Sequence, residues 1–238
     1  MRTHGKAPNE RALRTPRAAA IAGLLFSLLL LVSFALLRLT IPMEPLDSGS
    51  WLTRYPERLS WALYLVPFTG IAFLWFIAVL RDRLGDQEDR FFATVFLGSG
   101  LLFLGLLFML AAIAQGLIAA FATAEASEPR AFQFARTAIF EIFNVYMVKM
   151  AAVFMFTAST LTIRTEIAPR WIALVGYVLA LILLLASSLI AWSFVVFPLW
   201  VMLMSASILS DEFGLMPRRL RLRFLATLRR RAGAWLHG

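Results

Sequence analysis

Three polar side chains interrupt the fourth long apolar stretch of this chain, and they are its strongest candidates for chemistry. Glu141, Asn144 and Lys149 lie between Phe132 and Ile163, where most other residues are apolar. At about 100° per residue of α-helix they share one broad face, which we expect to point toward other helices. A lysine near the centre of a membrane span costs roughly 2.5–3.5 kcal/mol on insertion scales, so this ammonium calls for a partner or a water path.

These residues allow three interpretations. Lys149 could extend its ammonium toward the outer water layer while Glu141 sits at the membrane interface. Alternatively, the three side chains could form a polar intramembrane site that passes a solute or an ion, or they could form an assembly contact. A direct ion pair is not expected, because eight residues of helix separate Glu141 from Lys149 by about 12 Å. In each case we expect Lys149 to face the bundle or the outer water and not the lipid tails.

Other kinds of reactive site find little support in the sequence. The chain has no cysteine, which excludes disulfides, thiolate metal sites and cysteine nucleophiles. The two histidines, His4 and His237, lie near the two ends, so no span offers a histidine ligand to haem or metal. Ser99 lies in a Gly-Ser-Gly segment, but without an intramembrane histidine base we interpret it as a small packing residue. We expect no catalytic residue, no metal and no cofactor.

The elements that carry these residues are membrane helices. The chain is 61% hydrophobic and 16% charged, and its mean hydropathy of +0.78 lies outside the range of soluble domains. A bilayer core of about 30 Å needs roughly 20 helical residues. Uncharged stretches of at least that length occur at Ala18–Leu37, Trp61–Leu80 and Phe91–Ala114. The sequence therefore predicts an all-α polytopic membrane helical bundle.

Two long apolar stretches decide how many helices cross the membrane. Phe91–Ala124 is too short for two crossings with a turn, so it predicts one long helix that extends beyond the membrane. Trp171–Leu209 could be one helix or two. The seven arginines that follow it favour two crossings, with a turn near Ala191–Val195, because cationic residues concentrate on the cytoplasmic side. This threading gives six transmembrane helices with both termini cytoplasmic, and it places 17 of the 23 lysines and arginines inside.

Charge also divides the chain into three parts. Residues 1–17 form a basic cytoplasmic tail ahead of a retained first span, residues 18–210 form the six-helix transmembrane domain, and residues 211–238 form a second basic tail. In this tail arginines alternate with leucines, which predicts an amphipathic helix on anionic lipid headgroups at the cytoplasmic face and not a nucleic-acid site. The predicted headgroup contacts are Arg218, Arg219, Arg221, Arg223, Arg229, Arg230 and Arg231.

Small residues recur at four-residue spacing in two of the predicted helices. Ala112, Gly116 and Ala120 form one such series, and Gly176 and Ala180 form another. Small side chains let helix backbones approach closely. We expect these contacts within the chain, with a contact between two copies as the alternative.

The layout as a whole resembles a group of bacterial membrane proteins. A charged turn runs into a phenylalanine-rich helix at Arg81–Phe92, and arginine outnumbers lysine by 21 to 2. In these respects the chain resembles uncharacterised small multi-span membrane proteins of GC-rich bacteria, which implies a bacterial plasma membrane and no assigned activity. We interpret the chain as a non-enzymatic membrane protein that acts through helix packing, lipid contact, or a membrane-protein partner or homo-oligomer. The alternative is a small transporter or channel centred on Glu141, Asn144 and Lys149.

Overall fold

The structure is an all-helical bundle. It is a computed structural model that describes residues 15–40, 56–82, 90–122, 129–165, 167–186 and 193–212, and no strand occurs among them. In chain order the helices are α1 (Thr15–Thr40), α3 (Pro56–Asp82), α4 (Arg90–Ala122), α5 (Pro129–Glu141), the π-helix η1 (Ile142–Met147), α6 (Val148–Thr165), α7 (Arg170–Ala186) and α8 (Ser193–Glu212).

Within the part of the chain that the structure describes, five stretches of helix are long and apolar enough to cross a membrane. They are Ala18–Leu37, Glu57–Arg81, Phe91–Ala120, Arg130–Thr165 and Ser193–Ser210. The fourth of them runs without interruption through α5, η1 and α6. Helix α7 is apolar but has 17 residues, about 25 Å, which is slightly less than the hydrocarbon thickness. The prediction of a helical membrane bundle is confirmed, and the chain is a multi-pass membrane protein.

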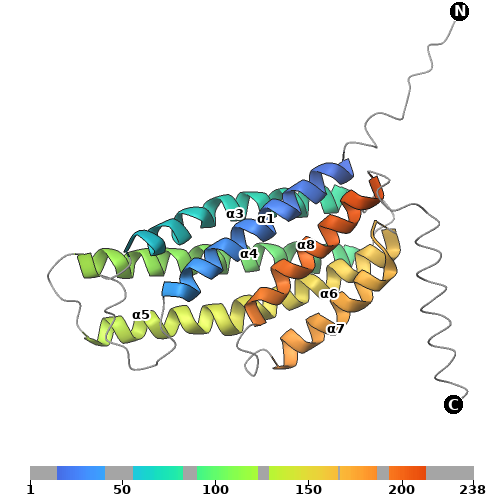
Figure 1. Ribbon diagram of the computed structural model, residues 1–238. Coiled ribbons are helices and arrows are strands. Elements are labelled where there is room, and N and C mark those ends of the chain that lie inside the picture. The colour runs from blue at the N-terminus through green and yellow to red at the C-terminus, as the bar shows by residue number, and fades with distance from the viewer. Residues whose placement is uncertain are drawn as a thin grey trace, which may run out of the picture.

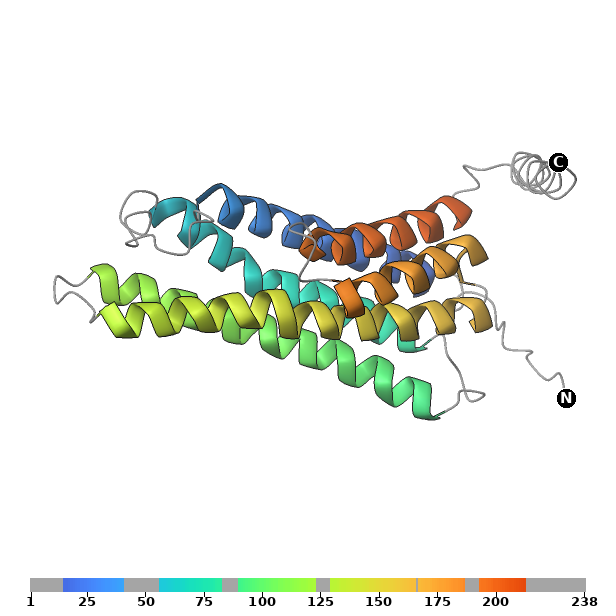
Figure 2. The same cartoon turned by 90° about the horizontal axis from the view of Figure 1, so that it is seen from below.

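The helices alternate in direction, and their ends form two groups (Figures 1 and 2). One end of the bundle gathers the starts of α1, α4 and α7 and the ends of α3, α6 and α8. There the Arg164 guanidinium lies 4.9 Å from the ring centre of Phe92, which joins the end of α6 to the start of α4. Toward the opposite end, α4 and α5 project well past α7 and α8. We call this opposite end the far end of the bundle.

Two predictions about helix division can be compared with this arrangement. The single long helix predicted for Phe91–Ala124 is confirmed as α4, which has 33 residues. The division of Trp171–Leu209 into two helices is also confirmed, but the predicted turn position is partly wrong. Residues 193–195 of the predicted turn are helical, because α8 begins at Ser193, and residues 191 and 192 lie outside the described residues. Helix α7 has 17 residues and α8 has 20.

Phenylalanine rings from five helices fill the centre of the bundle. Phe26 of α1 stacks on Phe73 of α3 with ring centres 4.5 Å apart, and Phe73 lies 5.2 Å from Phe154 of α6. Phe103 of α4 and Phe197 of α8 meet edge to face at 4.9 Å. Lipid tails are as apolar as these rings, so burial alone does not drive the helices together. Dispersion between closely packed rings is what stabilises the bundle.

The small-residue series has two different outcomes. A Cβ atom added at Gly176 would collide with Ser159 of α6 and Trp200 of α8, and Ala180 is fully buried, so the predicted packing within the chain is confirmed for α7. For α4 it is wrong. Ala112 is exposed, and a Cβ at Gly116 would have no neighbour within 4 Å. At these two positions the surface of α4 has no close neighbour among the described helices.

The two basic tails cannot be compared with the structure in the same way. Residues 1–14 and 213–238 lie outside the described residues. The predicted amphipathic helix and all seven of its arginines therefore remain a prediction. The boundaries at residues 17 and 210 fall inside helices, because α1 begins at Thr15 and α8 ends at Glu212.

Candidate functional site

The three predicted polar residues lie along one continuous stretch of helix but point to different surroundings. Glu141 is the last residue of α5 and is exposed. Asn144 lies in η1, and its side-chain amide donates a hydrogen bond of 3.0 Å to the Phe140 carbonyl of the preceding turn. Lys149 lies at the start of α6, half-buried, and its ammonium donates to the Leu184 carbonyl of α7. None of the three hydrogen-bonds to another, so the structure does not bring them together as one polar cluster.

The π-helical segment explains why the expected shared face is not found. The face was predicted at 100° per residue, which holds only for a regular α-helix. Ile142–Met147 instead forms i→i+5 turns, which take more residues per turn and change the direction of every side chain beyond them. Glu141 precedes this segment in the chain and Lys149 follows it. Their relative orientation therefore cannot be calculated from sequence spacing alone.

Lys149 finds its partner at the end of a neighbouring helix. The last four carbonyls of an α-helix have no amide partner within the helix, and this end carries a partial negative charge. Leu184 is two residues from the end of α7. The Lys149 ammonium therefore satisfies an acceptor and complements the helix dipole at the same time. This partner was not predictable from residue types, because the carbonyl belongs to the backbone and the sequence does not locate the end of α7 accurately enough.

Two further hydrogen bonds join α7 to the bundle. The Thr160 and Tyr177 hydroxyls lie 2.8 Å apart between α6 and α7. The indole nitrogen of Trp200 in α8 donates to the Ile172 carbonyl at 3.2 Å. Together with Lys149, these bonds hold α7 near its start, at its middle and near its end. Hydrogen bonds between membrane helices contribute about 0.6–2 kcal/mol each, so this series is a substantial attachment for a short helix.

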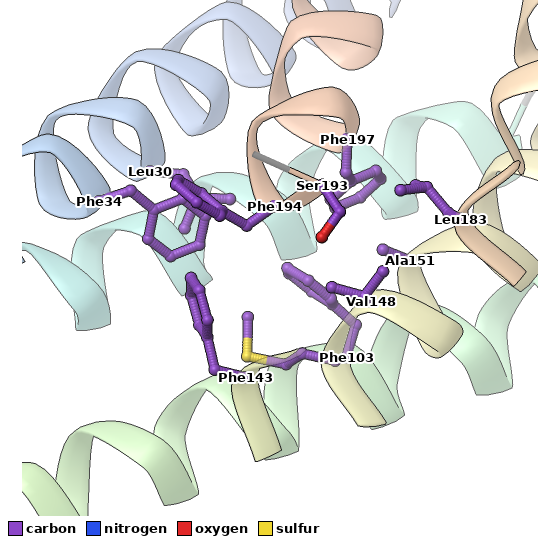
Figure 3. Close-up of a pocket in the computed structure, with 11 residues that line it drawn as sticks. Leu30, Phe34, Phe103, Phe143, Val148, Ala151, Leu183, Ser193, Phe194 and Phe197 are labelled. Atoms are coloured by element: carbon purple, nitrogen blue, oxygen red, sulfur yellow. The ribbon is translucent and has the colours of Figure 1, made fainter. Parts of the chain in front are cut away.

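A small cavity lies next to the Lys149 contact (Figure 3). Val148 lines it from one side and Leu183 from another, Met147 also belongs to the lining, and the hydroxyl of Ser193 points into it. Three rings, Phe34, Phe143 and Phe194, pack around part of it with centres 5.1–5.4 Å apart.

The cavity volume is about 10 Å³, which is room for about one water molecule. A buried water needs two to four polar partners. The lining residues are apolar apart from Ser193, so this cavity is not a solute-binding site of the kind that a transporter would need.

The remaining predictions about the site concern residues outside it. Ser99 is buried, and its hydroxyl donates to the Phe96 carbonyl of its own helix at 3.1 Å, as a packing residue would. Among the described residues no group of three or more histidine, aspartate and glutamate side chains could hold a metal ion. His4 and His237 lie outside the described residues.

A second opening lies between α3 and α4, where sequence analysis placed no candidate residue. Its residues include Pro67, which lies inside α3, and Gln115, the one amide side chain of α4. These two residue types were the available signals, because proline removes a backbone donor and a lipid-facing amide lacks hydrogen-bond partners.

Comparison of the chain with protein-family models, curated proteins and solved structures finds no match. The class of protein therefore follows from the helices alone. It is a multi-pass helical membrane protein whose intramembrane lysine contacts the end of a neighbouring helix.

Proposed function

We propose that this chain is a bacterial plasma-membrane protein that acts by contact with lipid and with a membrane partner, and that it neither catalyses a reaction nor passes a solute. The observation that carries the proposal is the position of Lys149. Its ammonium contacts the end of α7, and the adjacent cavity has room for about one water molecule. The group with the strongest potential for solute binding therefore has a structural role.

One feature of the sequence and one of the structure support contact with lipid and with partners. The seven arginines of the tail suit the headgroups of anionic lipids, at about 1 kcal/mol each near the surface. The open face of α4 supports a contact outside the chain, because its glycines at 98, 105 and 116 meet no other part of the described bundle. A homo-oligomer or a second membrane protein could use that face.

Water access to position 149 tests this proposal against the transporter alternative. The chain has no cysteine, so single cysteines can be introduced at 149, 141 and 158 and labelled with a membrane-impermeant thiol reagent. Glu141 is exposed and lies about 23 residues before Arg164, more than the roughly 20 that cross the hydrocarbon core, and Ala158 is fully buried, so E141C and A158C are the fast and slow controls. We expect K149C in liposomes to react at a rate close to that of A158C. Labelling as fast as that of E141C would show a water path to position 149 and would contradict the proposal.

A further inference from the structure

An open groove runs between α3 and α4 and reaches the surface of the bundle. Its volume is about 610 Å³, which lies within the range of about 300–1,000 Å³ for small-molecule sites. Helices α3 and α4 lie side by side along it (Figure 1). Ser60, Tyr64 and Pro67 line it from α3, and Phe108, Ala111 and Gln115 line it from α4.

Pro67 creates an unusual acceptor in this groove. It lies inside α3, and proline has no amide hydrogen to donate to the carbonyl four residues earlier. That carbonyl belongs to Leu63, which also lines the groove. In a membrane a backbone carbonyl without its amide partner is costly unless another donor reaches it. The groove therefore contains a position that favours a hydrogen-bond donor.

The polar groups of the groove lie on the side that faces the far end of the bundle. Ser60 and Tyr64 precede Pro67 in α3, and Gln115 follows Phe108 in α4, so in these antiparallel helices all three lie toward the far end. The walls beyond them are formed by Pro67 and Phe108. The groove is polar toward one end and apolar over the rest. An amphiphilic molecule therefore fits it better than a wholly apolar helix does.

Counting along α3 places this polar end at the level of the lipid headgroups. About 20 residues of helix cross the hydrocarbon core. If Arg81 marks one edge of the core, Trp61, which precedes it by about 20 residues, lies at the other edge. Trp61 is 63% exposed and Tyr64 is 60% exposed, and their rings pack edge to face at 5.8 Å. Exposed tryptophan and tyrosine are typical of the membrane interface. The polar end of the groove thus lies where a lipid headgroup meets its acyl chains.

Close contact at Gly70 shapes the apolar part of the groove. A Cβ atom added there would collide with the ring of Phe108 and with Leu104 of α4. The glycine therefore lets the Phe108 ring lie directly against the backbone of α3. The ring is still 41% exposed, so one face of it remains open to an acyl chain.

We propose that this groove binds one phospholipid whose headgroup donates hydrogen bonds, with its acyl chain along Pro67 and Phe108. Ammonium or hydroxyl donors of the headgroup bind the Leu63 carbonyl, with Ser60, Tyr64 and Gln115 as further partners. The inference rests on the proposed function, because it names the lipid chemistry and the location of one lipid contact.

Two lipids with the same acyl chains test the proposal. Phosphatidylethanolamine carries an ammonium with three N–H donors, and phosphatidylcholine carries none. The full-length protein is equilibrated with both lipids in detergent, and bound lipid is measured by native mass spectrometry. We expect phosphatidylethanolamine to be retained about tenfold better, as one hydrogen bond from a charged donor would give.

Three variants connect the preference to the groove. Pro67→Ala restores the amide donor to the Leu63 carbonyl, so the two lipids should be retained equally. Ala111→Trp fills the groove and should remove the retention of both lipids. Leu102→Trp is the matched control, because Leu102 is exposed on α4 outside the groove, and it should behave as the parent protein does. Circular dichroism confirms that each variant remains helical.

Equal retention of the two lipids by the parent protein would overturn the inference, and so would unchanged retention in Ala111→Trp. A dimer that Ala111→Trp dissociates while lipid retention is unchanged would show that a second copy occupies the groove, which also overturns it. The proposed function fails separately, through fast labelling of K149C, so the two failures can be distinguished.

Discussion

Lys149 shows how a residue that suggests chemistry in the sequence can have a structural role. If Lys149 only extended toward water, Lys149→Met would be neutral or slightly stabilising, because an apolar side chain of similar length would remain. Its bond to the Leu184 carbonyl changes this expectation. The methionine variant should lose about 1.5–3 kcal/mol of unfolding free energy, the range for a hydrogen bond to a charged group. Denaturant unfolding in detergent measures the loss, and Lys149→Arg, which keeps a cationic donor, should retain most of the stability. A stability equal to that of the parent would show that the contact contributes nothing.

The glycines provide a second prediction at the residue scale, with two positions that differ in their surroundings. Gly176→Ala would push a methyl group against Ser159 and Trp200, and overpacking of this kind costs about 1–3 kcal/mol. Gly105→Ala meets nothing within 4 Å and replaces a poor helix former, so it should gain up to about 1 kcal/mol. Thermal unfolding of the two variants in the same detergent compares them directly. A loss of stability in Gly105→Ala would indicate that this face of α4 already packs against another molecule.

At the scale of elements, the sequence predicted the lengths and divisions of the helices, which depend on hydropathy. It did not predict features that depend on backbone geometry. The length of α4 and the division between α7 and α8 followed from apolar stretches and charge. The π-helix did not, because Ile142–Met147 has no residue pattern that distinguishes it from a regular helix. The candidate residues were located on the correct helix, but their partners were not predicted. Those partners are backbone carbonyls, namely that of Leu184 for Lys149 and that of Phe140 for Asn144.

The π-helix itself can be tested by removing one residue from it. Deleting Val145 should convert η1 into regular helix and leave the orientation of α5 nearly unchanged, because a π turn holds about one residue more than an α turn. Deleting Ala138 from the regular helix α5 should instead rotate the start of α5 by about 100°. Phe132 of α5 is buried in a cluster with Leu117 of α4, and only the second deletion would turn it away. Cysteines at 117 and 132 should therefore be joined by a short bismaleimide in the parent background and after deletion of Val145, and not after deletion of Ala138. Loss of linkage after deletion of Val145 would show that η1 does not hold one extra residue.

At the scale of the whole molecule, unequal helix lengths give the bundle its shape. Helix α4 has 33 residues, about 50 Å, whereas α7 has 17, about 25 Å. Both begin at the same end of the bundle, so the longer α4 continues past the end of α7, and α4 and α5 project beyond the α7–α8 pair (Figure 2). A single flat membrane surface at the far end cannot match both lengths. Either α4 and α5 project into water or the bilayer is thinner beside α7, and thinning costs only fractions of a kcal/mol per Å of mismatch.

The short α7 makes the number of crossings the most informative test of the whole fold. If α7 crosses, the chain crosses six times and both termini are cytoplasmic, which agrees with the 17 of 23 lysines and arginines predicted inside. The start of α7 lies beside the end of α8 at one end of the bundle, as two successive crossings require. We expect reporters fused after Leu236 and after Arg90 to be active on the cytoplasmic side, and a tag inserted after Ile190 to be accessible from outside. A fusion after Leu236 that reports from the outside would leave five crossings, and the Lys149 contact with α7 would then have to form in a helix that enters the membrane without crossing it.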